Sequence, residues 1–468
     1  MPVRSLTEAL PAAWARGEVS VIGLARSGRA VAELLRRAGA EVYASDAGAG
    51  HAVLRATLHL EPLGVEVEHG GHDLKRIAKS ALVVASPGVP PDAPPLKAAR
   101  DAGVPIVGEL EIALQFLPHE RYIAITGTNG KTTTTALVER LLQGLGYDAV
   151  AAGNIGTPLS EIALREKQPD WIALEMSSFQ LHDTPSVSPA AGILTNLSAN
   201  HLDRYDSVEA YYGDKRKLFR NAGDRSAWVS NADDEAVQAM VAGVPGRHLR
   251  FSTSSVADGY FDRSTNSLMV LGSTLLSRAE LTLLGDHNVA NALAATLAVI
   301  GADALHASPK NRALMADALR NFRALEHRIE PAGRYGDVDW INDSKSTNVA
   351  STLVALKGMH KPTVLLLGGR HKGEPYTALG DELKRTVKQV IAYGEAADTI
   401  AKDLDGIVPV EVMGSSFEDV LARARAIATG GDVVLLSPAC SSYDMFDNYE
   451  ERGRVFKQLA AELGAKTA

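Results

Sequence analysis

The chain has very little cysteine, with Cys440 as the single one among 468 residues. One cysteine excludes an intrachain disulfide and is typical of a protein from a reducing compartment. The sequence also lacks any run of about 18 apolar residues, which a membrane-spanning helix would need. Its first residues show no basic-then-apolar pattern of a signal peptide. We therefore expect a soluble protein of the cytoplasm that does not enter a membrane.

An excess of positive charge and low-complexity sequence are also missing. The formal net charge is −8, so no global positive field favours nucleic acid or an anionic membrane surface. An anionic ligand must then be held by local lysine, arginine and backbone N–H groups. Hydrophobic residues make up 46% of the chain and charged residues 22%, which is typical of a globular protein. The length suits roughly two to four domains.

The most informative stretch is residues 123–133, Ile-Ala-Ile-Thr-Gly-Thr-Asn-Gly-Lys-Thr-Thr. An apolar, β-branched run leads into a turn bracketed by Gly127 and Gly130, and a helical pattern follows over residues 134–142. This strand–loop–helix order is typical of a phosphate-binding P-loop. The glycines let backbone N–H groups approach an anion closely, and the helix N-terminus adds partial positive charge.

Lys131 and Thr132 follow the second glycine of this loop. Lys131 would reach the outer phosphates of a nucleotide, and the hydroxyl of Thr132 would ligate Mg²⁺. The loop is two residues shorter than the standard G-x-x-x-x-G-K-[ST] pattern, so an ordinary strand-to-helix turn is the alternative. Gly-Lys-Thr-Thr at this junction favours the phosphate site, which by itself suits a kinase, a ligase, a switch or a motor.

The first segment, residues 19–108, alternates strands with helices, as a doubly wound nucleotide-binding domain does. The pattern predicts strands over residues 19–22, 41–45 and 82–85, and a helix over residues 29–38. A glycine turn from Gly23 to Gly28 resembles the dinucleotide fingerprint, with Asp46 where a ribose-binding acid would lie. Ala25 replaces the middle glycine, which disfavours a dehydrogenase but leaves another nucleotide diphosphate plausible. A purely structural glycine turn is the alternative.

Two strands of the second segment, residues 171–176 and 191–195, end in polar residues. Glu175 lies where an α/β sheet places catalytic groups, and it could hold Mg²⁺ across from Thr132. Its alternative is a capping or first-turn acid of a helix. His201 and Lys215, taken alone, are more simply a surface imidazole and part of a solvated helix face.

The end of the second segment changes pattern. Residues 249–284 show short β alternations with polar turns, which predict an antiparallel appendage. Asn288 and Asn291 then begin an Ala/Leu-rich helix that runs to Ile300. They are three residues apart and hence on one helix face, where they would act as caps or hydrogen-bond a base.

The third segment begins near Arg323 and predicts a second doubly wound domain. Its predicted strands are residues 338–341, 363–367, 390–392, 408–412 and 433–436. Three strand ends carry reactive side chains: residues 342–348, 368–372 and 437–444. Asp343 and Lys345 suit a nucleotide, and the serines, threonines and lysines suit a small carboxylated ligand.

The predicted fold class is therefore α/β, with three domains. Residues 1–109 are predicted to form a Rossmann-like, nucleotide-binding domain, and residues 110–323 a central P-loop ATPase-like domain with the small antiparallel β appendage. Residues 324–468 are predicted to form a C-terminal, Rossmann-like domain that suits a small carboxylated ligand.

Over essentially its whole length the sequence resembles the Mur ligases. The motifs that carry the resemblance are residues 126–132, 153–156, 175–180, 196–205, 285–291, 326–328, 342–348 and 437–452. Asn-Asp-Ser-Lys-x-Thr-Asn and Ser-Pro-Ala-Cys-x-Ser are typical of the branch that adds D-glutamate. The Asp-Asn-Pro-Arg motif of the diaminopimelate- or lysine-adding branch is absent.

The resemblance implies an ATP-dependent carbon–nitrogen ligase of peptidoglycan synthesis. ATP would phosphorylate the alanyl carboxylate of UDP-MurNAc-L-Ala, and the amine of D-glutamate would attack the acyl phosphate. The partners would be these small molecules alone, without nucleic acid or membrane, and the protein would be a monomer. An acyl phosphate hydrolyses readily, so the domains should close around it and exclude water.

The resemblance also assigns residues to roles. Catalytic roles fall to Lys131, Glu175, His201 and Lys215. Metal ligands are Thr132 and Glu175 at a first Mg²⁺ site, and His201 and a carbamylated Lys215 at a second. ATP would contact Gly127, Thr128, Asn129, Gly130, Lys131, Thr132, Thr133, Asn288, Asn291, Arg328 and Asp343. The UDP substrate would contact Arg26, Ser27, Asp46, Ser86, Gly88, Asn154, Ser177 and Gln180. D-Glutamate would contact Lys345, Thr347, Lys372, Ser442 and Tyr449.

The sequence departs from the family pattern at several positions. Asn200 and Asp214 stand where the family usually has Asp and Ala, and Tyr449 where Phe is frequent. The spacing from His201 to Lys215 is one residue short, which leaves Lys217 as an alternative carbamate site.

Three other functions compete with the D-glutamate ligase. A folate polyglutamylase shares the P-loop, but the nucleotide-binding pattern of the first segment argues against it. A nucleotide switch would not need Glu175 and His201, the candidate metal ligands. No Asn-Lys-x-Asp guanine motif is present either. An oxidoreductase would rest on the first glycine turn, where Ala25 is unfavourable.

Overall fold

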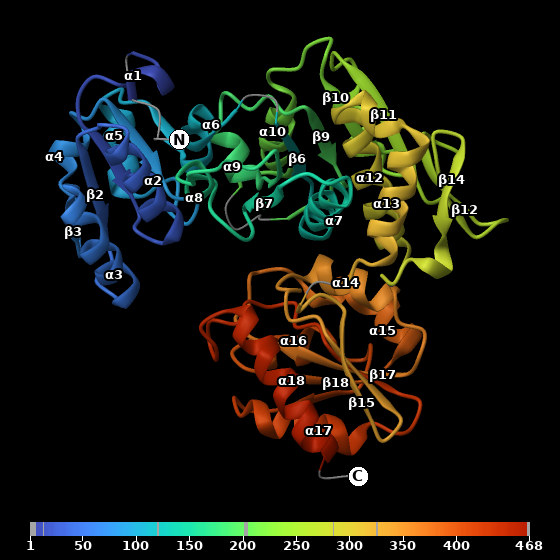
Figure 1. The fold of residues 1–468 in the computed structure, drawn as a ribbon. Helices are drawn as coiled ribbons and strands as arrows, with labels where there is room; N and C mark the ends of the chain where they lie inside the picture. Colours follow the sequence, from blue (N-terminus) through green and yellow to red (C-terminus); the bar gives the residue numbers. More distant parts are fainter. Residues whose placement is uncertain are drawn as a thin grey trace. The chain divides into compact units, whose positions relative to one another are not determined.

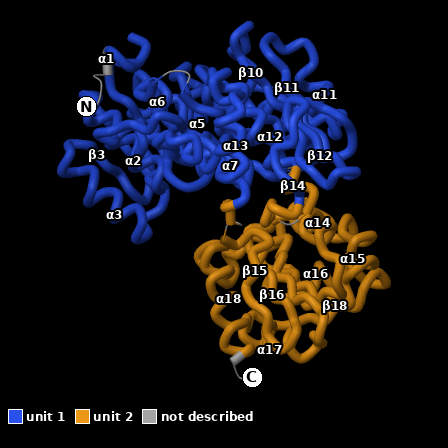
Figure 2. The backbone as a smooth tube through the Cα atoms, turned by 45° about the vertical axis from the view of Figure 1, so that its right-hand side comes forward, with its two compact units in different colours: residues 1–278, 290–320 blue, residues 279–289, 321–468 orange. Residues whose placement is uncertain are grey.

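The structure is a computed structural model that describes residues 6–12, 14–118, 121–200, 205–283, 285–323 and 326–465. It contains three β-sheets, one in each predicted domain (Figure 1). By backbone contacts the first two sheets lie in one compact unit and the third sheet in another (Figure 2). Unit 1 holds residues 1–278 and 290–320, with the first two sheets, and unit 2 holds residues 279–289 and 321–468, with the third.

The first sheet is parallel, in the order β3-β2-β1-β4-β5. Its strands are β1 Val19–Ile22, β2 Val42–Asp46, β3 Glu66–His69, β4 Leu82–Ala85 and β5 Ile106–Gly108. Its helical segments are α1 Leu6–Ala9, α2 Arg26–Arg37, α3 His51–Leu60, η1 Glu61–Leu63, α4 Leu74–Ile77, α5 Pro94–Asp101 and α6 Glu109–Phe116. The strand order reverses between β1 and β4, so the loops after these strands meet at the position where such sheets bind ligands.

The second sheet has nine strands in the order β14-β13-β12-β11-β10-β9-β6-β8-β7. The strands are β6 Tyr122–Thr126, β7 Ala149–Gly153, β8 Trp171–Glu175, β9 Ala191–Leu194, β10 Ala227–Asn231, β11 Arg247–Ser252, β12 Gly259–Asp262, β13 Ser267–Val270 and β14 Ser273–Ser277. Strands β12, β13 and β14 pair antiparallel, which confirms the predicted appendage. Because β12 also pairs with β11, the appendage extends the main sheet instead of standing apart from it.

The helical segments around the second sheet connect strands that are mostly parallel, so they return the chain from one end of the sheet to the other. They are α7 Lys131–Gly144, α8 Leu159–Ala163, α9 Ser178–His182, α10 Val208–Arg216, η2 Lys217–Phe219, α11 Glu235–Val241, η3 Arg278–Glu280, α12 Asp286–Ala302, η4 Ala304–Ala307 and α13 Pro309–Arg320. Strand β6 is fully buried between β8 and β9, so the loop that follows it leaves from the middle of the sheet.

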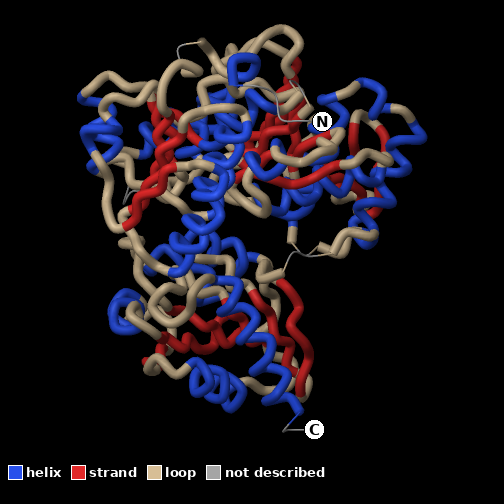
Figure 3. The backbone as a smooth tube through the Cα atoms, turned by 60° about the vertical axis from the view of Figure 1, so that its left-hand side comes forward, coloured by secondary structure: helices blue, strands red, loops and turns tan. Residues whose placement is uncertain are grey.

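The third sheet, in unit 2, has the order β15-β16-β20-β17-β18-β19. Its strands are β15 Glu330–Tyr335, β16 Val338–Asn342, β17 Thr363–Gly368, β18 Val387–Tyr393, β19 Val410–Val412 and β20 Val433–Leu436. Its helical segments are α14 Val349–Lys357, η5 Tyr376–Leu379, α15 Gly380–Thr386, α16 Ala397–Asp403, α17 Phe417–Ile427 and α18 Tyr449–Ala465. Helices flank the strands of this sheet, which is the layered arrangement expected of a doubly wound domain (Figure 3). No helix among the described residues is long and apolar enough to cross a membrane.

Candidate active site

The predicted P-loop lies between β6 and α7, and both of its glycines are required by geometry. Gly127 has a φ of 144°, and a Cβ there would lie 2.0 Å from Oγ1 of Thr195. Gly130 has a φ of 81°, and a Cβ there would lie 2.5 Å from Oδ1 of Asn291. L-residues rarely adopt such backbone conformations, and neither position has room for a side chain. The loop therefore keeps a bare backbone close to neighbouring polar groups.

Asn196, after β9, holds the loop in shape. Its backbone oxygen accepts from the N–H of Thr128 at 2.9 Å, and its Oδ1 accepts from the N–H of Asn129 at 2.8 Å. These two N–H groups thus already have acceptors. The donors that best suit a phosphate are in the first turn of α7, at Thr132 and Thr133, because N–H groups there have no acceptor within their own helix. The Oγ1 of Thr133 is buried without a hydrogen-bond partner in the described part of the chain.

Two lysines converge on the carbonyl oxygen of Gly127. Nζ of Lys131 donates to it at 3.0 Å and to the carbonyl of Thr128 at 2.8 Å. Nζ of Lys215, from α10, donates to the same oxygen at 2.8 Å, and Lys215 is only 1% exposed. Burial, and secondly the charge of Lys131, hold the pKa of Lys215 well below its usual value. A neutral amine at this position is therefore favoured.

Lys217, the alternative to Lys215, has a different environment. Its Nζ lies 2.6 Å from Oδ1 of Asp214 and 2.8 Å from Nδ1 of His182. Asp214 also accepts from the hydroxyl of Tyr205 at 2.9 Å. Lys217 is thus part of an ion-pair cluster between α9 and α10, whereas Lys215 reaches the P-loop.

Glu175 ends β8 beside the P-loop strand, in register with Ile125. The residue is 1% exposed, and its Oε1 accepts from Nδ2 of Asn154 at 2.8 Å. Its Oε2 is buried and has no hydrogen-bond partner among the described residues. An unpaired carboxylate oxygen is costly to bury, so this oxygen suits a cation. Asn154 lies on the loop after β7, where its N–H also donates to the carbonyl of Glu175 at 2.9 Å.

His201, the predicted partner of Lys215 in a second metal site, lies outside the described residues. Among the residues that the structure describes, no three His, Cys, Asp or Glu side chains come together as a metal-binding group. Asn200, which precedes it, is buried.

The loops after β1, β2 and β4 in the first sheet are tied to one another. Oδ2 of Asp46 accepts from the N–H of Leu24 at 2.7 Å, and its Oδ1 accepts from the N–H of Gly48 at 2.7 Å. Oγ of Ser86 donates to the carbonyl of Gly23 at 2.8 Å. Asp46 and Ser86 thus shape the glycine turn from both sides, a role that the sequence pattern did not indicate.

The other predicted UDP-binding residues of this domain lie around the same turn. Ser27 is half-buried in the first turn of α2, and Gly88 is exposed after β4. Arg26 is also exposed, but its guanidinium contacts Glu161 and Gly156 of the second sheet's domain.

A cavity of about 350 Å³ in unit 1 brings together Ser86 and Gln180, two of the predicted substrate contacts. Its walls come from the loop after β4, from α5 and from the α9 region, where Phe179 stacks on Tyr205 with ring centroids 5.2 Å apart. Gln180 and Ser177 form a capping box at the start of α9. Ser177 and Asn154 do not line this cavity.

Asn291 contacts the P-loop side of the site, and Asn288 lies three residues earlier on the same helix. Oδ1 of Asn291 accepts from Oγ1 of Thr134 at 3.2 Å. Both asparagines are buried.

In unit 2, the ends of three adjacent parallel strands, β16, β20 and β17, carry the predicted nucleotide and amino-acid residues. Oδ2 of Asp343 accepts from the hydroxyls of Ser346 at 2.5 Å and Ser437 at 2.7 Å. Its Oδ1 accepts from the N–H of Ile329 at 3.2 Å. Burial raises the pKa of Asp343 to about 6. Arg328 directly precedes Ile329 in the sequence, and its Nε is buried without a hydrogen-bond partner among the residues described.

The predicted D-glutamate contacts also lie in unit 2. Nζ of Lys345 lies 5.3 Å from the ring centre of Tyr449, and Nζ of Lys372 donates to Oγ1 of Thr347 at 3.3 Å. Ser442 is buried at the start of a turn, with its carbonyl accepting from the N–H of Phe446 at 2.8 Å.

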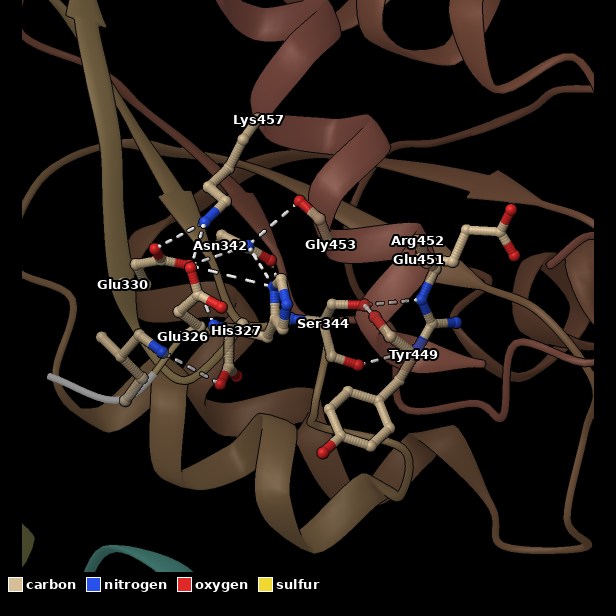
Figure 4. A network of polar contacts seen from close by, with 12 residues as sticks. Glu326, His327, Glu330, Asn342, Ser344, Tyr449, Glu451, Arg452, Gly453 and Lys457 are labelled. Carbon is tan, nitrogen blue, oxygen red and sulfur yellow. Dashed lines mark hydrogen bonds and ion pairs between the residues drawn. The ribbon is translucent and has the colours of Figure 1, made fainter. Parts of the chain in front are cut away.

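Sequence reasoning missed the residue that connects these three strand ends. Arg452 of α18 is fully buried and donates to the carbonyl of Ser344 at 2.8 Å (Figure 4). It also donates to the carbonyls of Cys440 at 3.2 Å and Gly368 at 3.5 Å. The sequence pattern does indicate that Arg452 is buried. It precedes the buried Phe456 by one helical turn and so lies on the apolar face of the helix.

His327 was also given no role by the sequence. Its Nδ1 accepts from Nδ2 of Asn342 at 2.9 Å, and that nitrogen also donates to Oε2 of Glu330 at 3.0 Å and to the carbonyl of Gly453 at 3.2 Å (Figure 4). The backbone N–H of His327 donates to the same Glu330 oxygen at 2.9 Å. This network fixes the backbone next to Arg328.

Together, these features define an α/β nucleotide-binding protein with a P-loop. The Mur ligase middle domain model matches residues 125–299. The model of the Mur ligase MurD-like N-terminal domain matches residues 17–108, and that of the Mur ligase glutamate ligase domain matches residues 327–440. The chain belongs to the Mur ligase family.

Curated relatives match along nearly the whole chain. A UDP-N-acetylmuramoylalanine–D-glutamate ligase from Acidobacterium capsulatum is 39% identical, over 96% of this chain and 97% of its own. One from Salinibacter ruber is 38% identical, over 96% of this chain and 98% of its own.

Solved structures share the fold. UDP-N-acetylmuramate-alanine ligase from Thermotoga maritima has a TM-score of 0.60 at 21% identity, covering 96% of this chain and 100% of its own. A MurF ligase from Thermotoga maritima in complex with ADP has a TM-score of 0.58 at 15% identity, covering 100% of this chain and 96% of its own.

Proposed function

We propose that this protein is an ATP-dependent amide ligase that adds D-glutamate to UDP-N-acetylmuramoyl-L-alanine during peptidoglycan synthesis. The alanyl carboxylate attacks the γ-phosphorus of ATP, forming an acyl phosphate and releasing ADP. The amine of D-glutamate then attacks the acyl carbon, and the tetrahedral intermediate expels phosphate and loses a proton to leave the amide. Phosphorylation is needed because a carboxylate alone is a poor electrophile.

The observation that carries this proposal is the convergence of Lys131 and Lys215 on the carbonyl of Gly127. A loop that only binds nucleotide needs the first lysine, whereas a second, buried lysine whose pKa is lowered by that burial indicates further chemistry at the same position. The names of the curated relatives and the Asn342–Asn348 sequence support D-glutamate as the amino acid.

The residues present fit ATP and Mg²⁺. Glu175 offers a buried carboxylate oxygen, and Arg328 a buried guanidinium nitrogen, and neither atom has a hydrogen-bond partner within the described ranges of the chain. Thr132 and Glu175 would hold one Mg²⁺, and His201 with carbamylated Lys215 a second. When bound, these ions supply charge neutralisation between the triphosphate and the attacking carboxylate.

The carbamate on Lys215 is supported by the burial of its amine, which lowers the pKa and so favours the neutral, nucleophilic form. Attack of the neutral amine on CO₂ forms the N–C bond and releases one proton, which converts the base into an anion. Such a group ligates Mg²⁺ as a carboxylate does. The P-loop backbone and Lys131 would cradle the β- and γ-phosphates, while Asn288, Asn291 and Asp343 would orient the nucleoside.

The UDP-linked substrate would lie against the loops after β1, β2 and β4. Ser27, Ser86 and Gly88 would hold its diphosphate end, and Asn154, Ser177 and Gln180 its muramoyl-alanine end. Asp46 would act by holding the N–H groups of the turn. Lys345, Thr347, Lys372, Ser442 and Tyr449 would bind D-glutamate. We expect a cytoplasmic monomer, since both nucleotide substrates are cytoplasmic metabolites and no second chain is needed to supply a residue.

The test is phosphate release by purified protein with ATP, Mg²⁺ and UDP-N-acetylmuramoyl-L-alanine, in the presence of single amino acids. We expect release with D-glutamate and the corresponding UDP-dipeptide by mass spectrometry. Lys131→Ala should lose on the order of a hundredfold or more in kcat, since it removes a charge aimed at the transferred phosphoryl group. Release with L-glutamate, L-lysine or diaminopimelate but not with D-glutamate would contradict the proposal, as would release independent of any amino acid.

A further inference from the structure

We infer that Arg26 is a positioning residue: its ion pair with Glu161 on α8 and its hydrogen bond to the carbonyl of Gly156 connect the UDP-binding domain to the loop that carries Asn154 and thereby fix Glu175. This inference rests on the proposed function, which it deepens. The contact joins two domains of unit 1, because Arg26 begins α2 of the first domain and Glu161 lies on α8 of the central domain.

The guanidinium of Arg26 is engaged on three of its nitrogens. Nε donates to Oε1 of Glu161 at 3.0 Å and Nη2 to Oε2 at 2.8 Å, which is a bidentate pair. Nη1 donates to the carbonyl of Gly156 at 3.0 Å. Planar, two-point pairing of this kind fixes direction as well as distance. With its nitrogens so occupied, Arg26 is better placed to hold protein than to bind a diphosphate.

Gly156 ends a short loop that is closely fitted to Glu175. At the other end of the loop, a Cβ on Gly153 would lie 2.2 Å from the carbonyl oxygen of Glu175. Asn154, between these glycines, bonds Glu175 through both its backbone N–H and its side-chain Nδ2, at 2.9 Å and 2.8 Å. A shift of Gly156 would therefore be transmitted to the carboxylate that we propose as a metal ligand.

The ion pair between Arg26 and Glu161 is reinforced by a second arginine, unlike an ordinary surface pair. Burial alone would raise the pKa of Glu161, but the hydrogen bonds and charges of Arg26 and Arg29 lower it overall. Nη2 of Arg29 lies 3.4 Å from the same carboxylate, one turn further along α2. Two arginines of one helix thus face a single acid of the neighbouring domain.

The ion pair between Arg26 and Glu161 would therefore couple binding of the UDP substrate to the position of Glu175. The first turn of α2 contributes to the proposed diphosphate site through Ser27, and Arg26 is the adjacent residue. Breaking the pair should therefore lower kcat through Glu175, whereas loss of a direct diphosphate contact would mainly raise KM for the UDP substrate.

The experiment compares Arg26→Ala, Glu161→Ala and the double variant in the complete protein. Arg37→Ala is the matched control, because Arg37 lies on the same helix, pairs with Glu33 and is 53% exposed against 57% for Arg26. We expect each single variant to lower kcat by about three- to tenfold with little change in KM for the UDP substrate, and the double variant to be no worse than either. Arg26→Lys should fall between, because it keeps the charge but loses the two-point geometry.

Hydrogen–deuterium exchange of the segment 153–157 provides a readout that does not depend on turnover. Both single variants should raise exchange there by about tenfold, and Arg37→Ala should leave it unchanged. If Glu161→Ala matches the wild type in exchange and kcat while Arg26→Ala raises KM, the inference is wrong and Arg26 is a substrate ligand. If the wild type shows no D-glutamate-dependent turnover, the proposed function fails, and the exchange result still decides whether Arg26 and Glu161 hold this loop.

Discussion

Nζ of Lys215 lies 2.8 Å from the carbonyl oxygen of Gly127, an oxygen that also accepts from Lys131 at 3.0 Å. Two full positive charges on one carbonyl would repel each other, and Lys215 is the more deeply buried of the two. The balance therefore favours Lys131 as the cation and Lys215 as the neutral amine. This division of roles is what a phosphate-binding lysine and a carbamylated lysine require.

We expect Lys215→Ala to lower kcat by on the order of a hundredfold or more, because it removes the carbamate that would ligate the second Mg²⁺. Growth with ¹³C-bicarbonate should give a carbamate carbon signal by NMR in the wild type and none in the variant. Lys217→Ala is the control, since Lys217 pairs with Asp214 and does not reach Gly127. Near-normal turnover by Lys215→Ala, or loss of the signal in Lys217→Ala alone, would show that the assignment is wrong.

Glu175→Gln should raise the Mg²⁺ concentration needed for half-maximal turnover by about tenfold or more. The amide keeps the bond from Asn154 but removes the negative charge next to the unpaired oxygen position. Titrations of Mg²⁺ at saturating ATP measure this directly. Glu139→Gln is the control, since Glu139 is a partly buried acid that likewise accepts one hydrogen bond, from the N–H of Ala151 at 2.8 Å. An unchanged Mg²⁺ requirement in Glu175→Gln would exclude Glu175 as a ligand.

Local sequence pattern was sufficient for several buried strands and for the P-loop, but it missed β10, Ala227–Asn231, which is also buried. Strands β1, β4 and β20 begin and end where the sequence predicts, because each is a short apolar run between turn residues. Strand β3, Glu66–His69, was missed because it is a polar edge strand with two exposed residues. Its neighbour across the sheet determines its conformation, and single-sequence pattern contains no signal of that partner.

The candidate site shows the same contrast between features that local sequence determines and features that depend on contacts between distant residues. Gly127, Gly130 and Lys131 are identified by spacing, since their roles depend on the loop itself. Asp46 is found by its spacing from the glycine turn, but its bond to Leu24 is not, and Arg452 was given no role, because these contacts join residues far apart in the sequence. Leu24 lies 22 residues from Asp46, and Ser344 lies 108 residues from Arg452. Such pairings become visible only once the sheets bring the loops together.

Glu109 gives unit 1 a pH-dependent stability. Its carboxyl is buried, accepts from the N–H of Ser160 at 2.6 Å and has a pKa that burial raises to about 7. The native state therefore binds a proton more tightly than the unfolded chain does. The stability that this carboxyl contributes is fully present below pH 4.5, its pKa in the unfolded chain, and it is lost as the pH rises through 7. The loss could approach about 3 kcal/mol at pH 8.

Glu109→Gln tests this effect, because the amide mimics the protonated acid and can still accept from Ser160. The melting temperature of the variant should match the wild type near pH 5 and exceed it increasingly up to pH 8. Glu41→Gln, at an exposed residue of the same domain, controls for the loss of one negative charge. A difference between Glu109→Gln and the wild type that does not change with pH would contradict the raised pKa.

Position 453 in unit 2 has no room for a side chain, since a Cβ there would lie 2.1 Å from Nδ1 of His327. His327 has a left-handed backbone, with a φ of 63°, and is held by Asn342, so its ring cannot easily retreat (Figure 4). Gly453→Ala should therefore destabilise the protein by about 1–3 kcal/mol. It should also raise KM for ATP, because displacement of His327 moves the adjacent Arg328. Gly414→Ala is the control, as a Cβ there meets no atom within 4 Å. Equal unfolding midpoints in urea for Gly453→Ala and Gly414→Ala would show that α18 does not press against His327 and that Arg328 is positioned without it.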